Sequence, residues 1–204
     1  MKLNLFKIIK NTNAEGPENR FCIWVQGCSN HCDGCYAEET WSFGENKLFE
    51  VEDLFEMIKG EKDIKGVTFL GGEPFEQAEA LSELAEKIQS IGLNVVTFTG
   101  LLYENLKNSK EKSVLKLLKN TDLLIDGGFE KDKVDFSRPW VGSSNQRYIF
   151  LSGKYDEKML SSYKNKIEVR INKDGTIFAN GMGDFSRLEE KLGLIRVFRR
   201  KENV

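Results

Sequence analysis

Short runs rich in β-branched and aromatic residues recur along the chain, each bounded by polar or turn-forming residues. Runs of this length and composition predict buried or half-buried strands. We therefore expect strands over residues 3–9, 20–26, 66–70, 94–99, 122–126 and 148–151.

Between several of these runs the apolar residues change to helical spacing. Residues 51–59, 76–91 and 112–119 each place apolar side chains three or four positions apart, which predicts amphipathic helices. Alternation of strands and helices is typical of crossover units around a mainly parallel sheet, so the fold class is α/β. Loops that follow the strands should gather at the carboxyl edge of that sheet, where α/β proteins place their active sites.

The pattern changes after residue 151. We expect a helix near residues 156–163 and then a β-hairpin that turns around Lys173-Asp174-Gly175. This organisation suggests a core over residues 1–151 and a C-terminal extension over residues 152–204, packed on the core.

Composition limits the class of protein. The chain has 204 residues, of which 40% are hydrophobic, enough for one enzyme-sized domain. Its 30 basic and 32 acidic residues nearly balance, so the total charge predicts neither a nucleic-acid partner nor a membrane surface.

No apolar run approaches the ~20 residues of a membrane span, and the first residues do not resemble a secretion signal. We expect a cytoplasmic protein. The basic end formed by Arg196, Arg199, Arg200 and Lys201 is expected to be solvated.

Three cysteines stand close together after the second predicted strand, as Cys28, Cys32 and Cys35. Three thiolates on one loop can hold three corners of a cubic iron–sulfur cluster and leave the fourth iron without a protein ligand. Electron-transfer clusters are usually closed by four cysteines, whereas an open metal position can bind and activate a small molecule. The spacing therefore predicts a reactive cluster.

A structural zinc ion is the main alternative for these thiols. Cys22 or His31 could provide a fourth ligand, although zinc ribbons more often use two distant pairs of cysteines. Disulfides are not expected in a cytosolic chain. We interpret Cys22 as a small buried apolar residue of its strand.

A second motif, Gly71-Gly72-Glu73-Pro74, follows the third predicted strand. Paired glycines let a ligand approach the backbone, and the proline holds Glu73 extended before it starts a helix. Such a turn presents carbonyl groups and a carboxylate, which suit an ammonium group. A tight strand-to-helix turn without a ligand is the alternative.

Together these motifs resemble the radical S-adenosylmethionine superfamily, and within it the activating proteins of anaerobic ribonucleotide reductases. The closer resemblance covers roughly residues 1–151. It rests on Val25-Gln26-Gly27-Cys28, Cys35-Tyr36-Ala37-Glu38-Glu39-Thr40-Trp41, Thr97-Phe98-Thr99-Gly100, Leu123-Leu124-Ile125-Asp126-Gly127-Gly128-Phe129 and Trp140-Val141-Gly142-Ser143-Ser144-Asn145-Gln146-Arg147. The fold it implies is a partial (β/α) barrel.

The resemblance also implies roles for individual residues. Cys28, Cys32 and Cys35 would ligate a [4Fe–4S] cluster whose open iron is chelated by S-adenosylmethionine. Gly71, Gly72 and Glu73 would hold the methionine ammonium. Ser144, Asn145 and Gln146 would reach the methionine carboxylate or the ribose, since hydroxyl and amide groups suit those contacts. Asp126 would position the nucleoside or a cation, or serve only as a turn acid, and Arg147 would pair with the carboxylate or lie on the surface.

The activity implied is reductive cleavage of S-adenosylmethionine to a 5′-deoxyadenosyl radical, which installs a glycyl radical on an anaerobic ribonucleotide reductase. A flavodoxin- or ferredoxin-type protein would supply the electron. One alternative is a radical enzyme that modifies a small molecule or peptide, and another is a non-catalytic metal-binding module.

This sequence departs from the family's usual pattern in three places. Glu18 follows Pro17 where the family typically has glycine, so Glu18 and Asn19 are expected to alter the lip of the site. Gly34 replaces an aromatic residue that is common elsewhere in the superfamily. The extension over residues 152–204 is additional, and it would bind the partner, complete the sheet, or mark a subfamily with another substrate.

Overall fold

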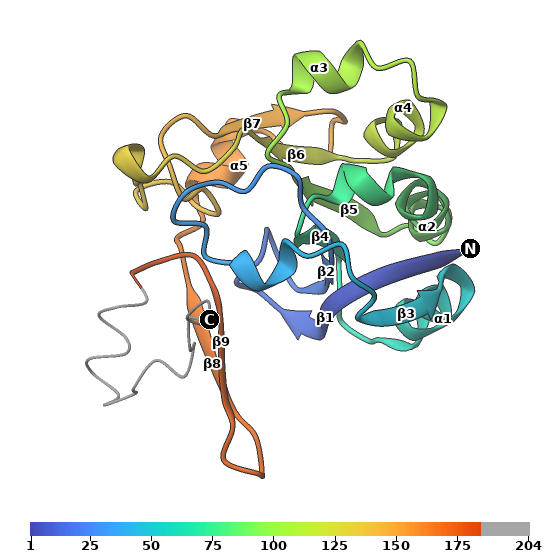
Figure 1. Ribbon diagram of the computed structural model, residues 1–204, viewed down its shortest axis with the longest axis horizontal. Coiled ribbons are helices and arrows are strands. Elements are labelled where there is room, and N and C mark those ends of the chain that lie inside the picture. Colours follow the sequence, from blue (N-terminus) through green and yellow to red (C-terminus); the bar gives the residue numbers. More distant parts are fainter. Residues whose placement is uncertain (185–204) are drawn as a thin grey trace, which may run out of the picture.

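The computed structural model describes residues 1–184 and shows one seven-stranded sheet with a separate two-stranded hairpin (Figure 1). The basic residues near the C-terminus lie outside the described residues. The strands of the sheet, in spatial order, are β3 (Lys47–Glu50), β1 (Lys2–Thr12), β2 (Arg20–Val25), β4 (Gly66–Gly71), β5 (Asn94–Phe98), β6 (Leu123–Asp126) and β7 (Arg147–Phe150).

The centre of this sheet is parallel and its edges are antiparallel. β2, β4, β5 and β6 pair in parallel, whereas β1, β3 and β7 are antiparallel to their neighbours. All six predicted strands are present. β3 was not predicted, because its four residues are largely exposed and carry no clear alternation of buried and exposed positions.

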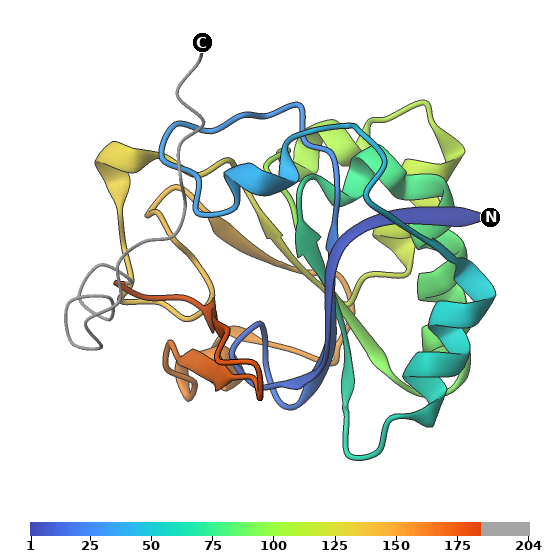
Figure 2. The ribbon, with the colours of Figure 1, turned by 60° about the horizontal axis from the view of Figure 1, so that its bottom comes forward.

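Helices cover one face of the sheet (Figures 1 and 2). α1 (Val51–Gly60), α2 (Ala78–Ser90) and α4 (Lys112–Lys119) match the three predicted helices, although the first residues of the second form the short 3-10 helix η2 (Pro74–Gln77). Their apolar stripes share one core with the strands, including Leu84, Ile88 and Leu117 against Phe21 and Phe69. The short helix α3 (Tyr103–Lys107) was not predicted, because one turn and a half is too short to show a periodic pattern. None of the helices in the described part is long and apolar enough to cross a bilayer.

The other face of the sheet is partly covered by the chain after β6. Trp140, Val141, Tyr155 and Leu160 pack with residues of β5 and β6, and Phe178 of the hairpin packs near Cys22 and Leu70. The architecture is therefore an open, mixed α/β sheet with helices outside, consistent with the expected partial barrel.

The predicted extension forms α5 (Glu157–Ser161) and the antiparallel hairpin of β8 (Ile167–Ile171) and β9 (Ile177–Gly181). Side chains join this hairpin to the end of β1. Thr12 Oγ1 donates to Glu168 at 2.7 Å, and Asn180 Nδ2 donates to the buried carboxylate of Glu15 at 3.1 Å. The hairpin is thus bonded to the core, while the division of the chain at residue 151 stays a prediction.

One expectation about the site's lip was wrong. Glu18 and Asn19 immediately precede β2, and the cysteines follow its other end, so the strand separates them by about 20 Å. Glu18 has a φ of 64°, the left-handed region that favours glycine. That backbone conformation explains why glycine suits this position, and its effect is on the turn into β2.

Burial raises the pKa of Glu15 to about 7, against the hydrogen bonds from Asn180 and the backbone of Gly181. The ordinary value for glutamate is near 4.5. The folded state therefore gains free energy of unfolding from the protonated Glu15 carboxyl. This contribution is complete below about pH 4.5 and is lost as the pH rises through about 7, by at most on the order of 3 kcal/mol.

We expect Glu15→Gln to flatten the decline of Tm between pH 5 and pH 8. Thermal unfolding at both pH values checks this, with the exposed Glu45→Gln as the control. An unchanged slope in Glu15→Gln would contradict it.

Candidate active site

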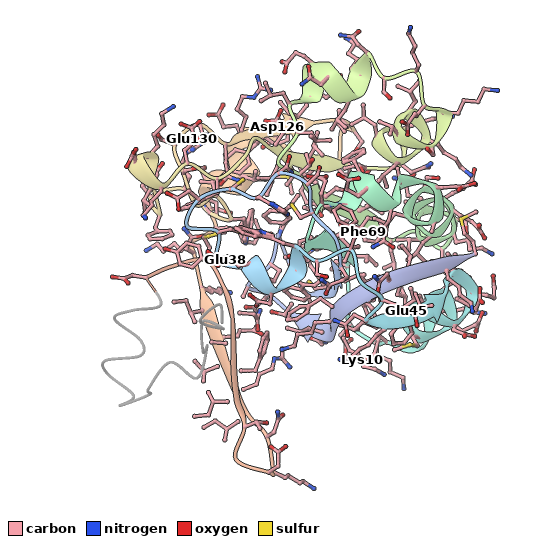
Figure 3. The ribbon with its side chains drawn as sticks, viewed as in Figure 1. Lys10, Glu38, Glu45, Phe69, Asp126 and Glu130 are labelled. Atoms are coloured by element: carbon pink, nitrogen blue, oxygen red, sulfur yellow. The ribbon has the colours of Figure 1, made fainter. Side chains whose placement is uncertain are left out.

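The loops of interest meet at the carboxyl ends of the four parallel strands. The cysteine loop follows β2, the Gly-Gly-Glu-Pro turn ends β4, Thr99 and Gly100 follow β5, and Asp126 ends β6. Because β7 runs antiparallel, the residues just before it, 144–146, reach the same edge. Figure 3 labels Asp126 at the end of β6 and Glu130 in the loop that follows. The predicted motifs are thus brought together by topology.

The backbone of the cysteine loop is fixed by the segment after it. The N–H of Gly27 donates to the carbonyl of Thr40 at 2.7 Å, and that of Cys28 donates to Trp41 at 3.2 Å. His31 stacks on the Trp41 ring, with 4.7 Å between ring centres. The loop is therefore held at both its start and its middle, and His31 is occupied by an aromatic contact.

The three thiols differ from Cys22 in their exposure. Cys28 is largely buried and Cys32 and Cys35 are half-buried, whereas Cys22 is fully buried in β2, as predicted. Burial raises the pKa of Cys28 and Cys35, although backbone N–H groups bond to their sulfurs and oppose the shift. Within residues 1–184 no three His, Cys, Asp or Glu side chains converge on a single ion position. Each cysteine of a four-iron cluster binds a different iron, so that chemistry does not need the thiols to converge.

Glu73 joins three of the loops. Its carboxylate is 1% exposed and accepts four hydrogen bonds, from the Phe75 N–H (3.0 Å), Thr99 Oγ1 (2.8 Å), the Gly100 N–H (2.8 Å) and Asn30 Nδ2 (3.0 Å). Burial raises its pKa and these four bonds oppose the rise. Asn30 lies between Cys28 and Cys32, so Glu73 ties the cysteine loop to the ends of β4 and β5.

The two glycines before Glu73 are needed by the chain itself. A Cβ on Gly71 would lie 2.7 Å from the Val25 nitrogen, and a Cβ on Gly72 would overlap the carbonyl of Gly27. The N–H of Gly72 donates to Val25, and that of Glu73 donates to Gly27, at 2.9 and 2.8 Å. The space left by the missing side chains is therefore filled by the end of β2 and the start of the cysteine loop.

The residues before β7 divide into two groups. The Gln146 amide is used within the loop, because its oxygen accepts from the N–H of Gly142 at 2.7 Å and its nitrogen donates to Gly127 at 3.0 Å. Asn145 Nδ2 donates to the Gly128 carbonyl at 2.8 Å, while its buried Oδ1 has no hydrogen-bond partner in the described part of the chain. Ser144 is exposed. Asn145 thus has an acceptor to offer and Gln146 does not.

Asp126 and Arg147 form an ion pair across the β6–β7 ladder. Asp126 is fully buried and also accepts a 2.8 Å bond from the Tyr103 N–H, while Arg147 additionally pairs with Glu104 at 2.8 Å. The two carboxylates raise the pKa of Arg147. In this arrangement the guanidinium already has two carboxylate partners, and Asp126 anchors the start of α3.

Comparison with known proteins identifies the family. A model of the family described as a 4Fe-4S single cluster domain matches residues 14–149. An anaerobic ribonucleoside-triphosphate reductase-activating protein of bacteriophage T4 is 30% identical over 151 residues, which cover 71% of this chain and 92% of the phage protein. Proteins of the same name from Vibrio cholerae and Pasteurella multocida are 30% and 31% identical, over 65% and 66% of this chain and 88% and 87% of theirs.

This chain belongs to the radical S-adenosylmethionine family. Its cofactors are therefore a [4Fe–4S] cluster and S-adenosylmethionine. The residues present fit both groups: three thiols occupy one well-anchored loop, and the unpartnered Oδ1 belongs to the Asn145 amide whose nitrogen bonds the carbonyl of Gly128. Gly128 itself lies beside the cysteine loop, because a Cβ on it would be 3.4 Å from Cys32 Sγ. The Asn145 side chain is therefore close to the cluster ligands.

Several residues that build the site were not singled out from the sequence. Asn30 was not among the candidate residues, Thr99 belonged only to a longer motif segment, and Thr40 acts through its backbone carbonyl. The signal for Asn30 was its place between two candidate ligands. Nothing in the sequence links it to Glu73, which is 43 residues away.

Proposed function

We propose that Cys28, Cys32 and Cys35 ligate the [4Fe–4S] cluster and leave its fourth iron for S-adenosylmethionine. The observation that carries this proposal is the anchored three-cysteine loop at the carboxyl edge of the parallel strands in a chain of this family. The match to a family with a 4Fe-4S cluster also favours an iron–sulfur cluster over a structural zinc ion at these cysteines. When reduced, the cluster supplies the electron that cleaves S-adenosylmethionine to methionine and a 5′-deoxyadenosyl radical.

The chain's own residues bind and orient. Since the carboxylate of Glu73 already accepts four bonds, we assign contact with the methionine ammonium chiefly to the backbone carbonyls of Gly71 and Gly72, with Glu73 holding the turn in place. Asn145 Oδ1 accepts from a ribose hydroxyl of the cofactor, and Ser144 lies at the rim. Gln146 and the Asp126–Arg147 pair shape the loops around them.

We expect Asn145→Ala to weaken S-adenosylmethionine binding while the iron content stays unchanged. A lost hydrogen bond to a neutral hydroxyl costs about 0.5–1.5 kcal/mol, or roughly 2- to 13-fold in affinity. Titration of the reduced cluster with S-adenosylmethionine, followed spectroscopically, measures this. Asn108→Ala, at the exposed residue that follows α3, is the matched control. Wild-type affinity in Asn145→Ala would remove this residue from the cofactor site.

The substrate we propose is a glycine of an anaerobic ribonucleotide reductase, from which the radical abstracts an α-hydrogen. This follows the names of the relatives, which activate such reductases. A flavodoxin- or ferredoxin-type donor would supply the electron. The alternative is a small molecule or peptide modified without a protein partner.

Mixing the reconstituted protein anaerobically with reductant, S-adenosylmethionine and an anaerobic ribonucleotide reductase from the same organism tests the proposal. We expect the doublet of a glycyl radical in the electron paramagnetic resonance spectrum, because one α-hydrogen remains on that glycine. A reductase in which the glycine is replaced by alanine is the control. Turnover of a small molecule at an ordinary enzymatic rate, with no glycyl signal, would favour the alternative.

A further inference from the structure

β1 is covered along only part of its outer edge. β3 pairs with residues Lys2 to Leu5, while β2 pairs with the opposite edge up to Thr12. Residues 6–10 therefore pair with β2 on one side only, and on their outer side the backbone groups pair with no strand in the described part of the chain. An unpaired edge is a template for an added strand.

The hairpin turns this edge into a groove. Arg170 of β8 donates to the carbonyl of Asn11, and Glu168 accepts from the N–H of Asn13, so side chains rather than a strand ladder join β8 to β1. The hollow between them has a volume of about 290 Å³ and is lined by Lys7, Ile8, Ile9, Lys10, Arg170, Asn172 and Phe178. Figure 3 labels Lys10 at this edge. A hollow of this size is at the lower limit for small-molecule sites, so we look to strand pairing for most of the affinity.

The groove is cationic. Lys10 pairs with Glu61 and Arg170 with Glu168, whereas Lys7 has no carboxylate within ion-pair distance among residues 1–184 and lies over the ring of Phe178. Burial, reinforced by Lys47 and Arg170, lowers the pKa of Lys7 to about 8, so it stays mostly charged at neutral pH. A carboxylate placed here would gain a partially desolvated ion pair.

The order of residues along the edge gives the pattern of the occupant. Lys7-Ile8-Ile9-Lys10 places Lys7 and Ile9 on one face and Ile8 and Lys10 on the other. Cross-strand neighbours pair directly, and charged residues prefer opposite charges there. A second copy of the same edge would bring lysine against lysine, which disfavours a homodimer at this surface.

We propose that this groove binds an extended acidic segment of a partner protein, with the pattern acidic–aliphatic–aliphatic–acidic, as an added strand on β1. This surface lies beside the middle of β2, whereas the cysteine loop follows the end of β2, so the proposed binding does not depend on the radical reaction.

A synthetic peptide tests it on the full-length, cluster-loaded protein. The probe is fluorescein-labelled Thr-Glu-Val-Val-Glu-Thr with blocked ends, whose symmetric pattern fits either strand direction. The controls are the permuted Thr-Val-Glu-Glu-Val-Thr and the probe with both valine nitrogens methylated, which cannot complete a ladder. We expect anisotropy to show that only the first peptide binds, more weakly as salt rises, and hydrogen exchange to show protection of amides 6–10.

Lys7→Gln should weaken this binding by at least about tenfold, while Lys59→Gln, on the exposed face of α1, should not change it. Equal binding of the permuted or methylated peptide, no effect of Lys7→Gln, or no binding at millimolar peptide would overturn the proposal. Displacement of the probe by 10 mM inorganic phosphate without any amide protection would also overturn it, because it would indicate a simple anion site.

Discussion

Replacing Cys28, Cys32 or Cys35 by alanine is expected to abolish the cluster, whereas Cys22→Ala should retain it. Each of the three is one of three protein ligands, and two thiolates on a short loop are too few to hold four irons. We expect about four irons per chain in the reconstituted wild type and close to none in each of the three variants. Iron analysis and the visible absorption of the anaerobic protein measure this.

Cys22→Ala is the matched control because that thiol is fully buried in β2, with a raised pKa caused by burial. Its loss removes a small apolar group at a cost of about 1 kcal/mol in the free energy of unfolding. Loss of iron in Cys22→Ala together with its retention in Cys35→Ala would assign the ligands differently and overturn the proposed set.

Gly72→Ala is expected to have the second largest effect, on both stability and cluster loading. The new Cβ would overlap the backbone carbonyl of Gly27, which directly precedes Cys28, so the cysteine loop must move away from β4. Overpacking of this kind costs about 1–3 kcal/mol and more where only backbone can yield. In a chain of this size each kcal/mol lowers Tm by about 2–4 °C.

Gly60→Ala is the matched control. It lies in the last turn of α1 and a Cβ there meets nothing within 4 Å, so the change should be neutral or stabilising by up to about 1 kcal/mol. Thermal unfolding and iron content should separate the two variants. A Gly72→Ala protein with wild-type Tm and full iron would refute the tight fit between the two loops.

The order of elements could be predicted because it depends on local pattern. Apolar runs with helical or extended spacing marked every strand of the parallel centre and the three longer helices. β3 and α3 were not predicted because they are short and largely exposed. β3 forms only by pairing with residues 2–5 of β1. The antiparallel edges likewise depend on long-range pairing.

The site could be predicted as a set of motifs but not as a set of contacts. The acidic residue of the Gly-Gly-Glu-Pro turn looked free to meet a ligand, and its four donors come from Asn30, Phe75, Thr99 and Gly100, which only the fold brings together. The pairing of Asp126 with Arg147 spans 21 positions in the sequence. Side-chain chemistry names candidate partners, and the tertiary structure decides which pairs form.

Formation of 5′-deoxyadenosine shows whether the cluster held by Cys28, Cys32 and Cys35 cleaves S-adenosylmethionine. Anaerobically reconstituted protein should be incubated with dithionite and S-adenosylmethionine and the nucleoside products separated by chromatography. We expect 5′-deoxyadenosine and methionine in equal amounts from the wild type and from Cys22→Ala, and none from Cys28→Ala, Cys32→Ala or Cys35→Ala. A fully iron-loaded wild type that leaves S-adenosylmethionine intact, or cysteine variants that still cleave it, would contradict the assignment of reductive cleavage to this three-cysteine site.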